Sequence, residues 1–381
     1  MEKKKGSIHY SLTILVITLV IFSSCRALYY NIPELSDHKI FPFRIINPDP
    51  ESIRYFERAE NTDYLGKVLQ TNNNELLADA VPLDKYFEDS RAVAFIIIRN
   101  DTILYQKYKS PYNESSIFNI FSVTKIFITT LTGVAIGEGL IESVDQPVTD
   151  YIHELKGKKG FSDITIRHLL LHTSGIKFSD TKFSPLSDNA RYYYGRNLRK
   201  LVLKAKLYCE PGKEVHYNSA NTQLLGLILE RATGTTLSAY LEDKIWKEIG
   251  MQYPARWSMD NNSDEAFEKC FSCLNCTATD IARLGALYLD NGKYLNKQII
   301  PENYVYESTR RDTIAGSSWL FQYNIKLGPK KYGSYYAAGL FGQLLYIYPE
   351  KNLMIIRLGE KNIKYNPQLV RNNILQIIDQ L

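Results

Sequence analysis

The sequence has little of several features that mark particular protein classes. Its formal net charge is only +5 over 381 residues and the basic residues are scattered, which argues against a nucleic-acid surface. Internal repeats and low-complexity tracts are absent. Hydrophobic residues make up 45% and charged residues 23%, as in a folded globular protein rather than a disordered one. At roughly 150 residues per domain, the length provides core for about two domains.

Cysteine is also scarce, with five residues in the chain. Cys270, Cys273 and Cys276 follow one another too closely for all three to bridge one another, and Cys209 is far away in sequence. A Cys-x-x-Cys pair can bind a metal, but the second pair of a structural site is missing. We therefore expect no metal and no cofactor, and interpret these cysteines as small buried residues; one disulfide remains an alternative.

The apolar run near the N-terminus is short. Leu12 to Phe22 spans eleven residues, whereas a membrane helix needs about 20. The run follows Lys3 to Lys5, as in a secretory signal, and ends in Phe-Ser-Ser before Cys25, which resembles a relaxed bacterial lipoprotein signal. We expect residues 1–24 to be the signal peptide and Cys25 to carry the lipid that anchors the protein at a membrane of the cell envelope. A plain secretory signal and an uncleaved anchor are the alternatives, and all three place the folded part outside the cytoplasm.

Regular structure is expected only beyond the first quarter of the chain. Residues 26–80 carry four prolines among polar residues and predict a tether and lead-in. Ala92 to Ile98 is an apolar run rich in branched residues, and Thr102 to Tyr105 returns after a turn at Asn100 and Asp101. This pattern predicts a β-hairpin.

A second hairpin is predicted near the other end, from residues 344–348 and 353–357, and a C-terminal helix from residues 367–381. The stretch between the two hairpins, about residues 130–310, has a mostly helical pattern. We therefore predict an α/β fold in which strands from about 90–110 and 315–360 form one antiparallel sheet flanked by helices, with an inserted, mostly helical domain.

Ser122 and Lys125 are the first residues that point to chemistry. They lie three apart at the start of an apolar helical run, so their side chains share one face of the helix. A serine hydroxyl needs a neighbouring base to become a nucleophile, and a lysine can serve when burial and nearby charge lower its pKa. By itself, Ser-x-x-Lys more often marks a helix cap followed by a solvated lysine than a catalytic pair.

Four further segments accompany this motif. They are Ile164–Gly175, Tyr217–Ser219, Thr277–Arg283 and Ala337–Gln343. In this order, the five segments resemble those of the serine β-lactamase-like family, which includes class C β-lactamases, D-alanyl-D-alanine peptidases, esterases and 6-aminohexanoate-oligomer hydrolases. The resemblance covers about residues 85–381 and implies a β-lactamase/transpeptidase-like catalytic domain over residues 81–381.

The resemblance also implies a role for individual residues. Ser122 would attack a carbonyl and form an acyl-enzyme, while Lys125 and Tyr217 would share the proton transfers, with either of them as the base. The oxyanion would lie between the backbone N–H groups of Ser122 and Leu340. Gly339 would be required because a side chain there would fill the cleft.

Departures from the family pattern bear on the substrate. Ser219 stands where the family usually has an Asn that orients the substrate, and Ala337 and Ala338 replace the Lys and Thr that hold a substrate carboxylate. Without those side chains a carboxylate would be poorly paired, which a buried site penalises. The chain therefore resembles the esterase and amide-oligomer hydrolase branch.

These observations predict a serine hydrolase acting on a small-molecule or short oligomer ester or amide. One alternative is a D-alanyl-D-alanine peptidase or β-lactamase. Another is a catalytically weak binding or sensor protein on the same fold. His172, within the second matching segment, is interpreted as a structural hydrogen-bonding residue rather than a base.

Overall fold

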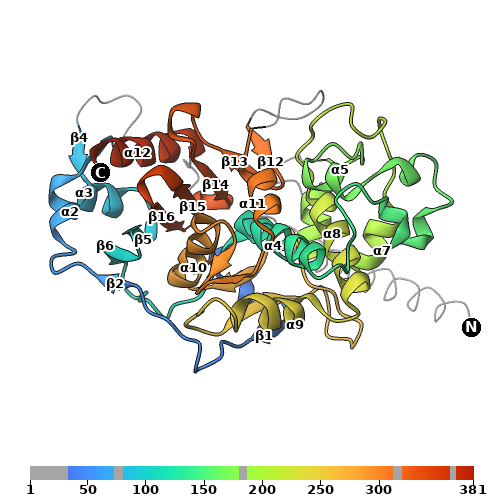
Figure 1. Ribbon diagram of the computed structural model, residues 1–381, viewed down its shortest axis with the longest axis horizontal. Coiled ribbons are helices and arrows are strands. Elements are labelled where there is room, and N and C mark those ends of the chain that lie inside the picture. Colours follow the sequence, from blue (N-terminus) through green and yellow to red (C-terminus); the bar gives the residue numbers. More distant parts are fainter. Residues whose placement is uncertain (1–32, 73–79, 180–186, 312–319, 361–365) are drawn as a thin grey trace, which may run out of the picture.

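The computed structural model describes residues 33–72, 80–179, 187–311, 320–360 and 366–381. The predicted signal peptide and Cys25 lie outside these residues. Among the described residues, no helix combines the length and the apolar character needed to cross a bilayer. The fold is mixed α/β, with antiparallel sheets and flanking helices as predicted (Figure 1).

An eight-stranded sheet forms the centre of the fold. In spatial order its strands are β12 (Phe321–Gln322), β13 (Ile325–Leu327), β14 (Tyr335–Ala338), β15 (Leu344–Tyr348), β16 (Leu353–Gly359), β5 (Ala92–Arg99), β6 (Thr102–Tyr108) and β2 (Glu57–Arg58). Both predicted hairpins are confirmed, as β5–β6 and β15–β16. Strands from the two ends of the chain meet where β5 pairs antiparallel with β16, so the predicted joining of the two hairpins in one sheet is also confirmed.

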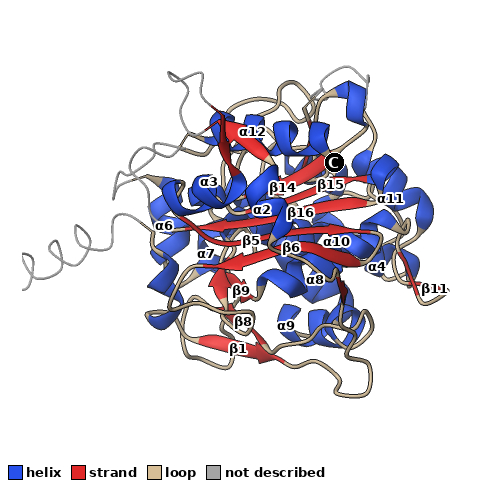
Figure 2. Cartoon of the chain, turned by 90° about the vertical axis from the view of Figure 1, so that its left-hand side faces the viewer, coloured by secondary structure: helices blue, strands red, loops and turns tan. Residues whose placement is uncertain are grey.

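Helices cover both faces of this sheet (Figure 2). Because successive side chains of a strand point to opposite faces, Phe95 and Ile97 of β5 pack on one side and Ile96 and Ile98 on the other. The first side is covered by α3 (Leu83–Asp89) and α12 (Pro367–Gln380), and the second by α4 (Thr124–Gly137) and α10 (Ala278–Leu289). This burial on both faces explains why β5 reads as a continuous apolar run.

The inserted region is mostly helical, but it also contributes two strands to a second sheet, whose other two strands come from the chain before the insert. Its other helices are α5 (Ile166–Leu170), α6 (Asp188–Tyr194), α7 (Leu198–Leu203), α8 (Ser219–Thr233), α9 (Leu237–Leu241) and α11 (Glu302–Thr309). The second sheet has the order β1 (Phe43–Ile46), β8 (Ala255–Ser258), β9 (Leu274–Cys276) and β7 (Phe118–Asn119). Strands of two to four residues carry too little alternation to be recognised in the sequence.

Residues 26–80, predicted as a tether and lead-in, take part in the fold where the structure describes them. Strand β1 pairs with β8, and β2 runs parallel to β6. The short α2 (Tyr64–Val68) follows, and β3 (Gln70–Asn72) pairs with β4 (Ala80–Pro82). The prolines and polar residues of this segment mark its turns and exposed faces, and its few apolar side chains, such as Ile46 and Phe56, are buried in the core.

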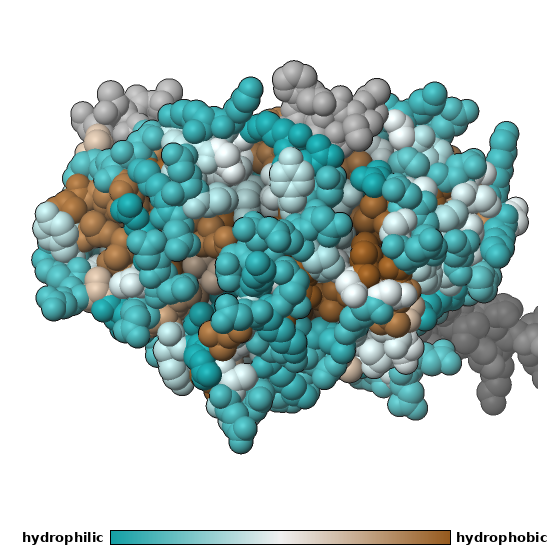
Figure 3. Space-filling view, viewed as in Figure 1, coloured by the Kyte–Doolittle hydropathy of each residue, from teal (hydrophilic) through white to brown (hydrophobic). Residues whose placement is uncertain are grey.

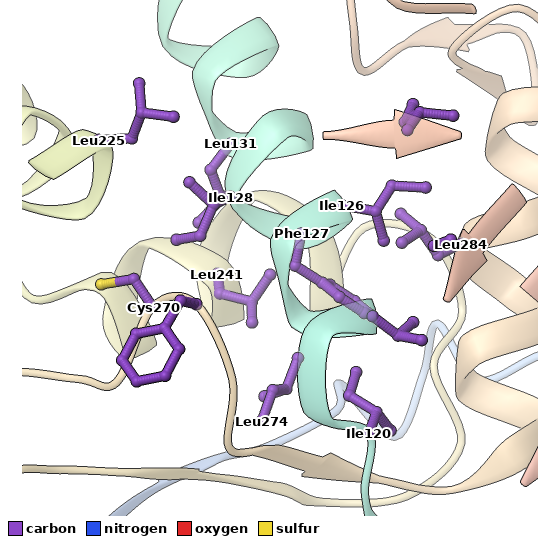
Figure 4. Packing of buried hydrophobic residues seen from close by; sticks show 14 of the residues in the cluster. Ile120, Ile126, Phe127, Ile128, Leu131, Leu225, Leu241, Cys270, Leu274 and Leu284 are labelled. Carbon is purple, nitrogen blue, oxygen red and sulfur yellow. The ribbon is translucent and has the colours of Figure 1, made fainter. Parts of the chain in front are cut away.

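Helix α4 runs through the middle of the molecule. Twelve of its fourteen residues are buried, so its apolar side chains are contacted from several sides. Figure 4 shows Ile126, Phe127, Ile128 and Leu131 of this helix among buried residues of neighbouring segments. A helix held on all sides gives the residues at its N-terminal end a fixed position.

Candidate active site

Ser122 and Lys125 meet at the N-terminal end of α4. Ser122 lies in a 3-10 turn, Phe121–Val123, that leads directly into the helix. The Lys125 Nζ donates to the Ser122 Oγ at 3.1 Å and to the backbone carbonyl of Phe271 at 2.8 Å. Lys125 is only 1% exposed, whereas Ser122 is half-buried.

The turn that carries Ser122 is tightly held. Phe121 has a φ of 45°, a left-handed conformation that is unfavourable for a phenylalanine. The backbone N–H of Phe121 donates to the Asn119 Oδ1 at 3.0 Å, and that of Ile120 donates to the Leu274 carbonyl at 3.1 Å. The pairing of β7 with β9 supplies these contacts, so the short second sheet positions the serine.

Tyr217 lies beside this pair, just before α8. The Lys125 Nζ is 5.0 Å from the centre of its ring, and the side chain exposes 36% of its surface toward the cleft. Burial of the hydroxyl would raise the pKa of Tyr217. The charge of Lys125 and hydrogen bonds with Lys125 and Ser122 outweigh burial, so the pKa of Tyr217 is lowered from its ordinary value.

His172 supports Tyr217 from behind. Its ring centre is 4.7 Å from that of Tyr217, and its Nδ1 accepts from the backbone N–H of Asn218 at 3.1 Å. Burial, together with the charge of Lys125, lowers the pKa of His172 to about 3, so the ring is neutral at physiological pH. The hydrogen bond from Asn218 agrees with the interpretation of His172 as a structural residue, and its role stays a prediction.

Gly339 and Leu340 follow the end of β14, directly against the serine turn. A Cβ on Gly339 would lie 2.7 Å from the Ile120 carbonyl oxygen and 3.1 Å from the Ser122 nitrogen. The Gly339 N–H donates to the Gln343 carbonyl at 2.7 Å, which fixes the turn. The structure therefore brings Gly339 and Ser122 together, and it is the backbone before Ser122 that leaves no room for a side chain.

The remaining predicted positions lie around this centre. Ser219 is the first residue of α8 and is buried, and no described hydrogen bond joins its side chain to Ser122, Lys125 or Tyr217. Ala337 is buried within β14, while Ala338 lines a cavity at the end of the strand. No long side chain reaches into the cleft from these two positions.

A cavity of about 340 Å³ opens beside Tyr217. It is lined by His172, Val215, Tyr217, Leu320, Phe321, Lys326, Leu327, Tyr336 and Arg371. Sequence reasoning missed Lys326 and Arg371, because each lies outside the matching segments and comes near Tyr217 only through the pairing of β13 with β14 and the packing of α12. The Phe271 carbonyl that holds Lys125 was missed for the same reason.

The cysteines provide no disulfide in the described chain. Cys209, Cys270, Cys273 and Cys276 are free, and the last three are buried. Burial raises the pKa of the Cys273 thiol to about 11. Among the described residues, no three His, Cys, Asp or Glu side chains are grouped as metal ligands would be.

Comparison with known proteins identifies the family. A family model described as Beta-lactamase matches residues 83–375. The chain belongs to the beta-lactamase family.

Individual relatives match part of the chain. It is 26% identical over 242 residues to the 6-aminohexanoate-dimer hydrolase of Paenarthrobacter ureafaciens, covering 61% of this chain and 60% of that protein. It is 30% identical over 199 residues to the esterase EstB of Burkholderia gladioli, covering 46% of this chain and 49% of that protein. The matched stretches thus span half to three fifths of these relatives.

Solved structures of the family share the fold. A Bacillus anthracis protein proposed to be a 6-aminohexanoate-dimer hydrolase superposes with a TM-score of 0.79 at 24% identity, covering 89% of this chain and 90% of that one. A penicillin-binding protein from Bacillus halodurans gives a TM-score of 0.62 at 18% identity, covering 78% and 99%. The predicted β-lactamase/transpeptidase-like fold is confirmed.

Proposed function

We propose that this beta-lactamase-family protein is a serine hydrolase that cleaves an ester or amide bond through an acyl-enzyme on Ser122. The observation that carries the proposal is the contact of the buried Lys125 Nζ with the Ser122 Oγ at 3.1 Å, beside a tyrosine whose pKa is lowered. A nucleophile, a cation and a proton carrier are thus brought together at the edge of a cavity.

In the first half of the reaction, Tyr217 as phenolate takes the proton of the Ser122 hydroxyl while the Oγ attacks the substrate carbonyl. The ammonium of Lys125 stabilises the phenolate before this transfer. The tetrahedral oxyanion is held by the backbone N–H groups of Ser122 and Leu340. Tyr217 then returns the proton to the departing alcohol or amine, which leaves the acyl group on Ser122.

In the second half, water enters in place of the leaving group. Tyr217 takes a proton from this water as its oxygen attacks the acyl carbonyl, and the same two N–H groups hold the oxyanion. Collapse of the intermediate returns the proton to the Ser122 Oγ and releases the acid. Side chains of this chain are sufficient for each proton transfer, and the cycle ends with free enzyme.

The substrate branch is proposed from the relatives. The names of the matched proteins include an amide-dimer hydrolase and an esterase. The absence of long side chains at Ala337 and Ala338 is compatible with that branch. Attachment to the cell envelope through a lipid on Cys25 is likewise a proposal, since that residue lies outside the described part of the chain.

The test compares the wild-type protein with Ser122→Ala on short p-nitrophenyl esters, on linear amide oligomers and on the cephalosporin nitrocefin. We expect wild-type turnover of esters or amides to fall to background in the variant, since the nucleophilic oxygen is gone. Turnover of nitrocefin alone would instead indicate the β-lactamase alternative. Equal turnover by both proteins, or no labelling of Ser122 by a fluorophosphonate, would contradict the proposal.

A further inference from the structure

Two cavities meet beside the proposed catalytic centre. The cavity next to Tyr217 has a volume of about 340 Å³, and a second of about 230 Å³ lies between the end of β14 and the start of α12. Both are lined by Lys326, Tyr336 and Arg371. A substrate that reaches from Ser122 past Tyr217 would therefore meet two cationic side chains.

The two cations come from different elements of the fold. Lys326 is the central residue of β13 and pairs with Tyr336 of β14, so their side chains lie on the same face of the sheet. Arg371 lies in the second turn of α12, where its Nη2 donates to the Gln368 Oε1 at 2.6 Å. This hydrogen bond orients the guanidinium but leaves its charge without a counter-ion.

Neither cation is paired within the described part of the chain. Many of the other described lysines and arginines form ion pairs, as Lys331 does with Asp379 at 3.7 Å. Among the described residues, Lys326 and Arg371 make no such pair. Both are half-buried. Figure 3 shows one face of the molecule as mostly hydrophilic, with apolar residues gathered in a few patches. Two unpaired cations in partly enclosed cavities favour an anionic ligand.

The charge of Lys326 also reaches the proposed catalytic centre. Together with Lys125 and the hydrogen bonds already described, it contributes to lowering the pKa of Tyr217. The cavity wall between them is apolar and aromatic, formed by Phe321, Leu327 and Tyr336. Such a wall suits a short carbon chain, with its reacting carbonyl at one end and a charged group at the other.

We propose that Lys326 and Arg371 form a subsite that binds a carboxylate of the substrate. The proposal rests on the proposed hydrolase function and specifies its substrates as esters or amides with a free carboxylate on the acyl or the leaving-group side. The ammonium of Lys326 on β13 and the guanidinium of Arg371 on α12 would supply the positive charge that is missing at Ala337 and Ala338. The expectation that a carboxylate would be poorly paired in this site follows from the motif alone, and it does not take these two residues into account.

The test uses matched ester pairs. For the acyl side they are mono-p-nitrophenyl glutarate and p-nitrophenyl butyrate, and for the leaving-group side 4-acetoxybenzoate and its methyl ester. In the wild-type protein we expect the anionic member of at least one pair to have the higher kcat/KM. In Lys326→Gln and in Arg371→Gln we expect its kcat/KM to fall roughly tenfold or more, chiefly through KM, because a charged hydrogen bond is lost. In Arg371→Gln the kcat/KM of the neutral esters should change less than about twofold. Lys326→Gln should also lower turnover of the neutral esters, because Lys326 helps to lower the pKa of Tyr217, but the anionic ester should lose more.

Lys330→Gln is the matched control, since it removes the same charge from an exposed residue that lines neither cavity. Added salt should reduce the preference for the anionic ester in the wild type and in this control. Equal loss on anionic and neutral esters, or the absence of any preference in the wild type, would overturn the proposal while leaving the Ser122 mechanism intact.

A binding measurement separates the subsite from catalysis. Ser122→Ala is titrated by calorimetry with monomethyl glutarate, which is anionic, and with neutral dimethyl glutarate. We expect the anion to bind more tightly, and a further Lys326→Gln change to remove the difference. If no ester is hydrolysed but this pattern appears, the hydrolase proposal fails and the anion subsite stands. If the two compounds bind alike, the subsite is refuted.

Discussion

The chemistry of this site depends on how Lys125 is neutralised. Its Nζ is buried and bonded to the Ser122 hydroxyl and the Phe271 carbonyl, and no carboxylate pairs with it within the described residues. A buried cation without a counter-ion is costly, and a phenolate at Tyr217 would relieve that cost. In the proposed mechanism Lys125 and Tyr217 therefore act as one unit, in which the lysine holds the charge and the tyrosine carries the proton.

A first prediction concerns this unit. Because the pKa of Tyr217 lies below its ordinary value, kcat/KM should rise with pH toward that pKa and level off above it, as the phenolate base becomes populated. Tyr217→Phe should lower kcat by roughly 10²–10⁴-fold and remove this rise. The measurement is the pH dependence of ester hydrolysis, with the exposed Tyr208→Phe as control. An unchanged pH profile in Tyr217→Phe would exclude Tyr217 as the base.

Local spacing made one part of this site predictable. Three residues of separation on a helix place Lys125 on the same face as Ser122, and the two side chains do meet. The Phe271 carbonyl, Lys326 and Arg371 approach from elements distant in sequence, and no local pattern specifies such contacts. The replacement of Lys and Thr by Ala337 and Ala338 suggested a site without positive charge. The motif alone therefore gave no sign of the two cations that line the neighbouring cavities.

At the scale of elements, the site lies where several short segments and turns meet, and not within the long strands. The serine turn is held by β7 and β9, which have two and three residues, and it abuts the turn after β14. The long hairpins follow apolar runs joined by turn residues, and α12 follows helical spacing, so both were predicted from the sequence. Strands as short as β7, β8 and β9 depend on their neighbours for stability, so the sheet that positions Ser122 could not be predicted.

A second prediction tests this junction. Gly339→Ala places a methyl group 2.7 Å from the Ile120 carbonyl and 3.1 Å from the Ser122 nitrogen, so the two turns must move apart. We expect kcat/KM to fall by about 10²–10³, the effect of losing one oxyanion donor, with the folded state retained. Gly157→Ala is the control, because a Cβ there would contact nothing within 4 Å. Full activity of Gly339→Ala on p-nitrophenyl esters would show that the close approach is not required.

At the scale of the whole molecule, the segment before the hydrolase-like part is a structural component. The Lys269 Nζ lies 4.7 Å from the centre of the Phe41 ring, and burial lowers the pKa of Lys269 to about 8. Arg44 of β1 pairs with Glu268 at 2.9 Å. Lys269 and Glu268 both precede Phe271, whose carbonyl holds Lys125. The N-terminal segment therefore contacts the stretch that leads to this carbonyl. Its prolines and polar residues concealed this role in the sequence.

The Arg44–Glu268 pair gives the third prediction. Glu268 is 0% exposed and Arg44 22%, and the remaining contacts of the Glu268 Oε1 are the N–H and hydroxyl of Ser238. Arg44→Met leaves a buried carboxylate without its cation, so the free energy of unfolding in urea should fall by about 3–5 kcal/mol.

Arg58→Met is the matched control for Arg44→Met, because Arg58 and its partner Glu114 are 53% and 48% exposed. Such a surface pair contributes about 0–1 kcal/mol, so this control should leave the urea midpoint nearly unchanged. Adding Glu268→Gln to Arg44→Met should recover part of the loss, since it removes the unpaired charge, and the double-mutant cycle measures the coupling. If Arg44→Met and Arg58→Met destabilise the protein equally, the Arg44–Glu268 pair does not couple residues 33–72 to the rest of the fold.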